Sequence, residues 1–179
     1  EMYKQALAME QAVLPATHPS IASSFINIAG VYDSKGEYDK SLEMHEKALT
    51  MLRAVLPETH PEIATSFNNM AGVYNSKGEY DTALEMCEKA LAMLQAVLPA
   101  THPSIATSFG NIAGVYNSKG EFDKALEMYE KALAMRQAVL PATHRSIFRT
   151  MRAIAELYKG FDRHDEALKM YVQVMALGD

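Results

Sequence analysis

The chain has 179 residues, of which 49% are hydrophobic, and a formal net charge of −5. This hydrophobic content is enough for a folded core, whereas the negative balance argues against a nucleic-acid or anionic-membrane partner, both of which need a broad basic surface. The apolar runs are far shorter than the ~20 residues that a membrane-spanning helix needs, and the single cysteine, Cys87, excludes an internal disulfide framework.

A 42-residue unit repeats along the chain. Its full form, His60–Thr101, returns at His102–Thr143, more loosely at His18–Thr59, and degenerately at His144–Asp179. A fixed period of this length predicts stacked supersecondary units. Between the two most similar repeats there are seven substitutions: Ser104 for Glu62, Gly110 for Asn68, Ile112 for Met70, Phe122 for Tyr80, Lys124 for Thr82, Tyr129 for Cys87 and Arg136 for Leu94.

The first segment, Glu1–Leu14, aligns with the second half of a repeat and predicts one helix without its usual partner. We therefore expect the chain to be a fragment of a longer array. Tyr3, Leu7 and Leu14 would form an exposed apolar stripe on this helix. Such a stripe predicts weak self-association, in which one copy stacks on the end of another.

Each repeat contains two helical patterns punctuated by proline and glycine. Ile21, Phe25 and Ile28 fall at helical steps of four and three residues. Gly36 is expected to close this helix in the left-handed conformation, and Asp39 to cap the next one. The predicted helices are Glu1–Leu14, Ser20–Lys35, Asp39–Leu56, Glu62–Lys77, Asp81–Leu98, Ser104–Lys119, Asp123–Leu140, Ser146–Lys159 and His164–Leu177.

The residues that could carry catalysis or bind metal are sparse. One histidine precedes the first helix of each repeat: His18, His60, His102 and His144. Because each is a whole repeat from the next, one metal ion cannot collect them, and they are interpreted as helix-entry residues. Cys87 is interpreted as a packing residue. No phosphate loop, GxSxG elbow or HExxH motif occurs, which predicts a non-enzymatic protein without a cofactor, and cysteine usage fits a reducing, cytoplasmic compartment.

Small and aromatic residues of the second full repeat resemble the tetratricopeptide consensus: Ala71, Tyr74, Gly78, Tyr80, Ala83 and Ala90. The string HPEIA…FNNMAGVYNSKGEYDTALEMCEKAL is similar to the 42-residue repeats of kinesin light chain. The resemblance covers nearly the whole chain and implies an all-α, right-handed superhelical solenoid of antiparallel helix pairs. It also implies that the first helices line a concave groove and the second helices form the convex back.

Amide side chains recur on these first helices, and they predict a surface that holds an extended peptide. An asparagine both donates and accepts hydrogen bonds, so a row of them can hold a peptide backbone. Arginines after the last asparagine can take carboxylates, which favours an acidic or C-terminal peptide. The predicted groove residues are Asn27, Asn68, Asn69, Asn75, Asn111, Asn117, Arg149 and Arg152.

Three alternatives remain open from the sequence. In the first alternative, Asn27, Asn69 and Asn111 form hydrogen bonds only to neighbouring helices. In the second, Arg152 pairs with Glu156 at i,i+4. In the third, the chain is a structural array that self-associates end to end without a specific peptide ligand.

Overall fold

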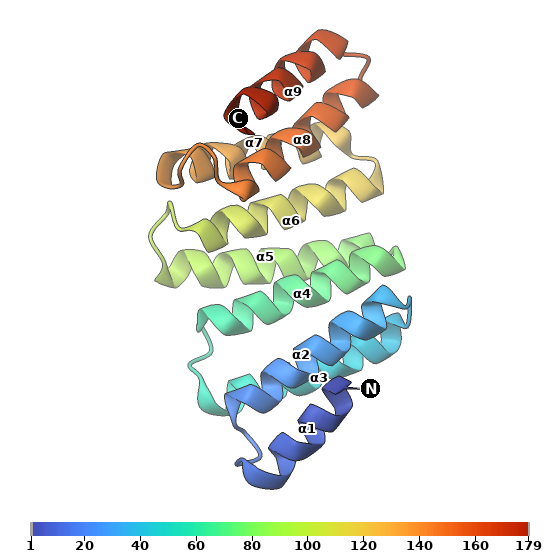
Figure 1. Cartoon of the computed structure of the whole chain (residues 1–179), viewed down its shortest axis with the longest axis vertical. Coiled ribbons are helices and arrows are strands. Elements are labelled where there is room, and N and C mark those ends of the chain that lie inside the picture. The colour runs from blue at the N-terminus through green and yellow to red at the C-terminus, as the bar shows by residue number, and fades with distance from the viewer. Residues whose placement is uncertain (1, 179) are drawn as a thin grey trace. The chain divides into compact units, whose positions relative to one another are not determined.

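The computed structural model describes residues 2–178, and the regular structure in this range is α-helical (Figure 1). Glu1, where the first predicted helix begins, lies outside the described residues. The nine helices of the described range are α1 Met2–Val13, α2 Pro19–Ser34, α3 Tyr38–Val55, α4 Pro61–Lys77, α5 Tyr80–Val97, α6 Pro103–Lys119, α7 Phe122–Val139, α8 Arg145–Gly160 and α9 His164–Gly178. Each predicted boundary inside this range lies within one residue of the observed one.

The helices form two compact units, α1–α5 and α6–α9. Within each unit, helices that follow one another in sequence pack as antiparallel neighbours (Figure 1). The predicted all-α array of successive antiparallel helix pairs is therefore confirmed. The right-handed superhelix, the single solenoid over the whole chain and the repeat limits stay predictions. Within residues 2–178, no helix combines the length and the apolar character that crossing a membrane requires.

A histidine begins the first helix of each repeat. The Nδ1 atoms of His18, His60, His102 and His144 each accept a hydrogen bond, 3.2 Å long, from the backbone N–H two residues ahead. This bond satisfies one of the amides that the first helical turn leaves unpaired. The prediction that these histidines serve helix entry is confirmed.

Left-handed residues close the first helices. Gly78 and Gly120, both at φ +83°, are the C-caps of α4 and α6. Asp162, which aligns with these glycines, takes the same region at φ +58° after α8. A side chain in this region costs free energy that glycine avoids, so the last repeat ends its helix less favourably.

The prediction that aspartates cap the second helices is wrong for α3 and α7. Glu37 is the N-cap of α3 and makes no side-chain capping bond, while Asp39 already lies in the first helical turn. α3 begins at Tyr38, one residue earlier than predicted, which places Asp39 inside the helix. The Glu37 carboxylate instead pairs with Lys40 at 2.5 Å, and Glu121 pairs in the same way with Lys124.

The core of each unit consists of small and branched aliphatic side chains at the helix crossings. In the first unit, buried Ser41 donates a 2.9 Å hydrogen bond from α3 to the carbonyl of Ala29 on α2. In the second unit, Ala113 of α6 is fully buried, as are Ile147 and Ile154 of α8. Burying an isoleucine contributes about 1.5–3 kcal/mol, so α8 is firmly seated against its neighbours.

Candidate functional site

The predicted groove residues of the first unit lie on α2 and α4. Asn27 is exposed, and Asn68 and Asn69 are half-buried. Neither Asn27 nor Asn69 bonds to a neighbouring helix within residues 2–178, so the first alternative interpretation does not hold for them. The carboxamide oxygens of Asn68 and Asn75 are both buried, and neither is therefore accessible to a ligand.

The predicted residues of the second unit converge more closely. Asn111 on α6 and Arg149 on α8 line one pocket. Asn117 lines a second pocket, which shares Tyr129 and Ala153 with the first. Arg152 is exposed on α8 and lies in neither of these two pockets.

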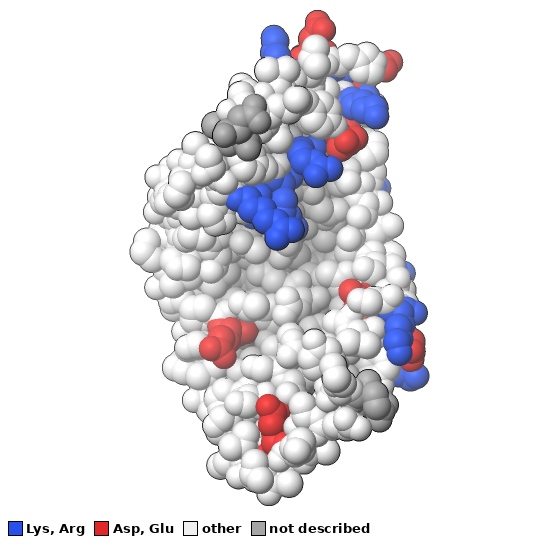
Figure 2. Space-filling model, viewed as in Figure 1, with Lys and Arg blue, Asp and Glu red and all other residues white. Residues whose placement is uncertain are grey.

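The first of these pockets, which we call the arginine pocket, has a volume of about 290 Å³. Its lining contains two arginines and no acidic side chain. Basic side chains gather over α6 and α8 on an otherwise largely neutral face (Figure 2). The lining residues are Thr107, Gly110, Asn111, Tyr129, Arg136, Ser146, Arg149, Thr150 and Ala153.

Arg136 reaches this pocket from α7 and is held there by two hydrogen bonds. Its Nη1 donates to the Thr150 hydroxyl on α8, and its Nη2 donates to the Ala106 carbonyl on α6 at 3.4 Å. Gly110 lies beside the guanidinium, and a Cβ atom at that position would be in van der Waals contact with it, 3.4 Å from Nη2. The guanidinium thus joins three helices of the unit.

The electrostatics of the pocket reflect burial and the second arginine. Burial lowers the pKa of Arg136, and the nearby positive charge of Arg149 lowers that pKa further. Burial raises the pKa of Tyr129, against the attraction that both arginines exert on its phenolate. Two like charges therefore share a half-buried space, an arrangement that an anion would stabilise.

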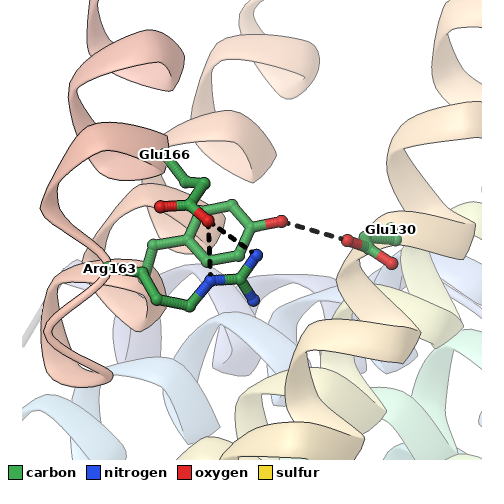
Figure 3. A network of polar contacts seen from close by, with 4 residues as sticks. Glu130, Arg163 and Glu166 are labelled. Atoms are coloured by element: carbon green, nitrogen blue, oxygen red, sulfur yellow. Dashed lines mark hydrogen bonds and ion pairs between the residues drawn. The ribbon is translucent and has the colours of Figure 1, made fainter.

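Arg163, in the same unit, shows how an arginine is neutralised elsewhere. It makes two contacts of 3.0 Å with Glu166 at the start of α9, and its guanidinium lies 4.5 Å from the centre of the Tyr158 ring. Figure 3 shows Arg163 directed at Glu166, with Glu130 nearby. In residues 2–178, neither Arg136 nor Arg149 has such an acidic partner.

The alternative pairing of Arg152 with Glu156 is not formed. Glu156 instead accepts a 2.5 Å hydrogen bond from the Tyr171 hydroxyl on α9. Arg152 consequently keeps an exposed guanidinium without an ion pair among the described residues.

Sequence reasoning missed Arg136 because it lies on a second helix, which was expected to form the back of the array. A signal was nevertheless present. Arg136 replaces Leu94, a buried residue, between two otherwise nearly identical repeats. A charge that enters a core position in such a pair of repeats indicates a local change of role.

Cys87 is fully buried, and burial raises the pKa of its thiol to about 12. The thiolate, which is the nucleophilic form, is therefore scarce at neutral pH. This supports the interpretation of Cys87 as a packing residue. In the part of the chain that the structure describes, no cluster of three or more His, Cys, Asp or Glu side chains could hold a metal ion.

Solved structures share this arrangement of helices. A kinesin light chain from Podosopora anserina with nearly identical TPR-like repeats is 26% identical, with a TM-score of 0.70 over 98% of this chain and 83% of that one. BtubC (BKLC) from P. vanneervenii is 24% identical, with a TM-score of 0.78 over 98% and 70%. A Rap protein complexed with competence and sporulation factor is 17% identical, with a TM-score of 0.83 over 98% of this chain and 46% of that one. The last two likenesses show the fold alone.

A comparison with curated proteins gives no match. The family model for the tetratricopeptide repeat, by contrast, matches residues 1–54, 62–138 and 105–178. These three matches cover nearly the whole sequence and agree with the paired helices and their glycine C-caps. The chain therefore belongs to the tetratricopeptide repeat family.

Proposed function

We propose that this chain is a non-enzymatic protein-interaction scaffold that binds an extended peptide segment along its first helices. Tetratricopeptide repeat domains are generally protein-interaction scaffolds and are typically non-catalytic. The observation that carries the proposal is the arginine pocket, where Asn111 and Arg149 face one space with no acidic side chain beside them.

The proposed contacts divide the work between amides and cations. In the first unit, Asn27 and Asn69 would hold a peptide backbone by accepting and donating hydrogen bonds, and in the second unit Asn111 and Asn117 would do the same. Arg149 and Arg152 would attract acidic side chains or a terminal carboxylate. Exposed contacts of this kind contribute only ~1 kcal/mol each, so affinity is modest and falls with added salt.

An unbiased peptide-library selection tests this function. It is run on wild type, on Asn69→Ala/Asn111→Ala and on Arg149→Ala/Arg152→Ala. Lys131→Ala is the control, because it removes an exposed charge from α7 outside the arginine pocket. We expect the asparagine variant to lose binding and the arginine variant to lose acidic preference. Peptides that bind all four proteins equally would place the site elsewhere.

Exposed apolar side chains favour a second function, a structural array that self-associates. Of the stripe predicted at the start of the chain, Tyr3 is exposed but Leu7 and Leu14 are half-buried. Met9 and Val13 on α1 are instead 72% and 78% exposed. Leu168 and Met175 on α9 are 62% and 72% exposed. Mass that rises with concentration in light scattering, without any selected peptide, would favour this alternative over the peptide scaffold.

A further inference from the structure

The substitutions between the two most similar repeats gather around one pocket. Those repeats differ at seven positions, and three of the differing residues, Gly110, Tyr129 and Arg136, line the arginine pocket. The equivalent residues of the preceding repeat are Asn68, Cys87 and Leu94, which bring no cation. The third full repeat therefore differs from the preceding one at the arginine pocket, where it has gained the guanidinium of Arg136.

Gly110 and Arg136, two of the exchanged residues, lie beside each other in the fold. Leu94, the equivalent of Arg136, is 1% exposed in the first unit, so this is a packing position in the preceding repeat. A Cβ atom at Gly110 would lie in ordinary van der Waals contact with the guanidinium, 3.4 Å from Nη2, so the two exchanged positions are neighbours in the fold. The exchange replaces the buried leucine side chain of the preceding repeat with a guanidinium that lines the arginine pocket.

The charge of Arg136 has no acidic partner in the pocket. Thr150 and Ala106 take two of the five N–H donors of Arg136, and neither of these partners is charged. Arg149, which aligns with Thr107, brings a second guanidinium to the same pocket. Two cations beside each other without a carboxylate among the lining residues leave an excess positive charge that an oxyanion can neutralise.

Some hydroxyl groups of the pocket are already engaged by the protein. The Thr107 hydroxyl donates to the Pro103 carbonyl at 3.0 Å, and the Thr150 hydroxyl donates to the Ser146 carbonyl at 2.8 Å. These two protons are committed to the helices. The Ser146 hydroxyl lies 2.8 Å from Nδ1 of His144 and is engaged there. The groups left to donate into the pocket are the guanidinium N–H groups, the Asn111 amide and the Tyr129 hydroxyl.

We infer that the arginine pocket is an oxyanion-binding site in which Arg136 and Arg149 grip one carboxylate or phosphate group from two helices. This deepens the proposed function and rests on it for the source of the group, which would be carried by the bound peptide. A planar guanidinium matches two oxygens of one such group. Arg136 is held by α6 and α8, whereas Arg149 is exposed and can close onto the ligand.

The pocket itself is tested first, with inorganic phosphate and acetate as probes. Binding is followed by NMR shifts of the arginine side-chain Nε–Hε groups in the full chain. We expect the Arg136 signal to shift and saturate. The variant Gly110→Asn/Arg136→Leu restores the residues of the preceding repeat, and it should weaken phosphate binding by at least about tenfold, because charge-assisted hydrogen bonds are lost.

Arg149→Thr introduces the residue that the preceding repeat has at the equivalent position, Thr107. It keeps Arg136 in place and replaces an exposed side chain, so the protein should still fold. This variant therefore tests the pocket even if the double variant does not fold. It should also weaken phosphate binding, with an unchanged melting temperature. Lys131→Ala should bind phosphate as wild type does. Equal phosphate affinity in wild type and both pocket variants, or shifts that never saturate, would overturn the inference.

The source of the oxyanion is then separated by matched peptides from the library selection. One pair ends in a free carboxylate or an amide, a second has Asp/Glu or Asn/Gln, and a third has phosphoserine or serine. We expect the two peptides of one pair to differ at least about tenfold in affinity for wild type, and to bind Gly110→Asn/Arg136→Leu equally.

Peptides that bind wild type without any such difference in affinity would overturn the inference while the scaffold function stands. Phosphate binding that depends on Arg136, with no peptide selected, would support the pocket and contradict the scaffold.

Discussion

Single side chains decide how the repeats differ in charge and in response to pH. His45, Cys87 and Tyr129 occupy the same position in successive repeats, and His45 is 4% exposed. Burial lowers the pKa of His45, against the attraction of Asp33. A neutral imidazole is therefore packed where the next repeat has a thiol.

The first prediction concerns the stability of the protein toward acid. Above about pH 6.5, His45 is neutral in both the folded and the unfolded chain, so its burial costs nothing extra. Below that pH the unfolded chain binds a proton more readily than the folded one, so stability falls as the pH falls. His45→Cys, which copies Cys87, should make this decline shallower by at most about 1.4 kcal/mol per pH unit.

Urea denaturation from pH 7.5 to 5 measures the difference, and the other five histidines are common to both proteins. Parallel stability curves for wild type and His45→Cys would show that this imidazole does not resist protonation in the folded state.

A second prediction at the residue scale concerns packing at a helix crossing. Ala71 is 1% exposed in α4. Ala71→Leu adds volume where there is no room and should destabilise the protein by about 1–3 kcal/mol. Ala92→Leu on the exposed face of α5 is the control and should have little effect. Chemical denaturation measures both variants, and an unchanged midpoint for Ala71→Leu would contradict the crossing.

At the scale of helices, local chemistry made the boundaries predictable from sequence. Proline at the first helical position, histidine before it and glycine after the last turn fix where α4 and α6 begin and end. Period and spacing supplied the rest. The capping role of Asp39 was predicted wrongly because the same residues are favourable at the N-cap and within the first turn, and the spacing does not separate these positions.

A third prediction tests the helix ends with two glycines of different conformation. Gly120→Ala places a Cβ at φ +83° and should cost about 1–2 kcal/mol. Gly72→Ala lies inside α4, where an added Cβ meets nothing within 4 Å. This substitution should stabilise the protein by up to ~1 kcal/mol, because alanine is the better helix former. Thermal unfolding measures both, and equal shifts of the same sign would contradict the cap assignment.

The candidate site was only partly predictable, for reasons that belong to tertiary structure. Asn111 and Arg149 were predicted together, because both lie on first helices and face the same way. Arg136 is 26 residues from Gly110, and only the packing of α7 against α6 shows that the two residues are neighbours. The buried oxygen of Asn75 was likewise hidden from a pattern that records residue type but not orientation.

At the scale of the whole molecule, a fourth prediction concerns association between copies. Met9 and Val13 expose apolar surface on α1, and Leu168, Val172 and Met175 expose it on α9. We expect weak association, seen as mass that rises with concentration in light scattering. Met9→Glu/Val13→Glu should reduce that rise, because two charges would have to be buried in the contact.

Ala92→Glu/Ala134→Glu adds the same charge on exposed residues of α5 and α7 and serves as the matched control. If both double variants reduce association equally, net charge rather than the α1 surface is responsible. If wild type stays monomeric at high concentration, the apolar side chains of α1 do not mediate contact between copies.

The residues of the arginine pocket come from two consecutive repeats, so duplication of one repeat does not copy the whole pocket. Gly110, Tyr129 and Arg136 belong to His102–Thr143, whereas Arg149 belongs to the segment that follows. A gene duplication of that one repeat would place the earlier copy of Arg136 beside a threonine equivalent to Thr107. Only the later copy would meet Arg149. The array can therefore lengthen by whole repeats while the two-arginine pocket stays single.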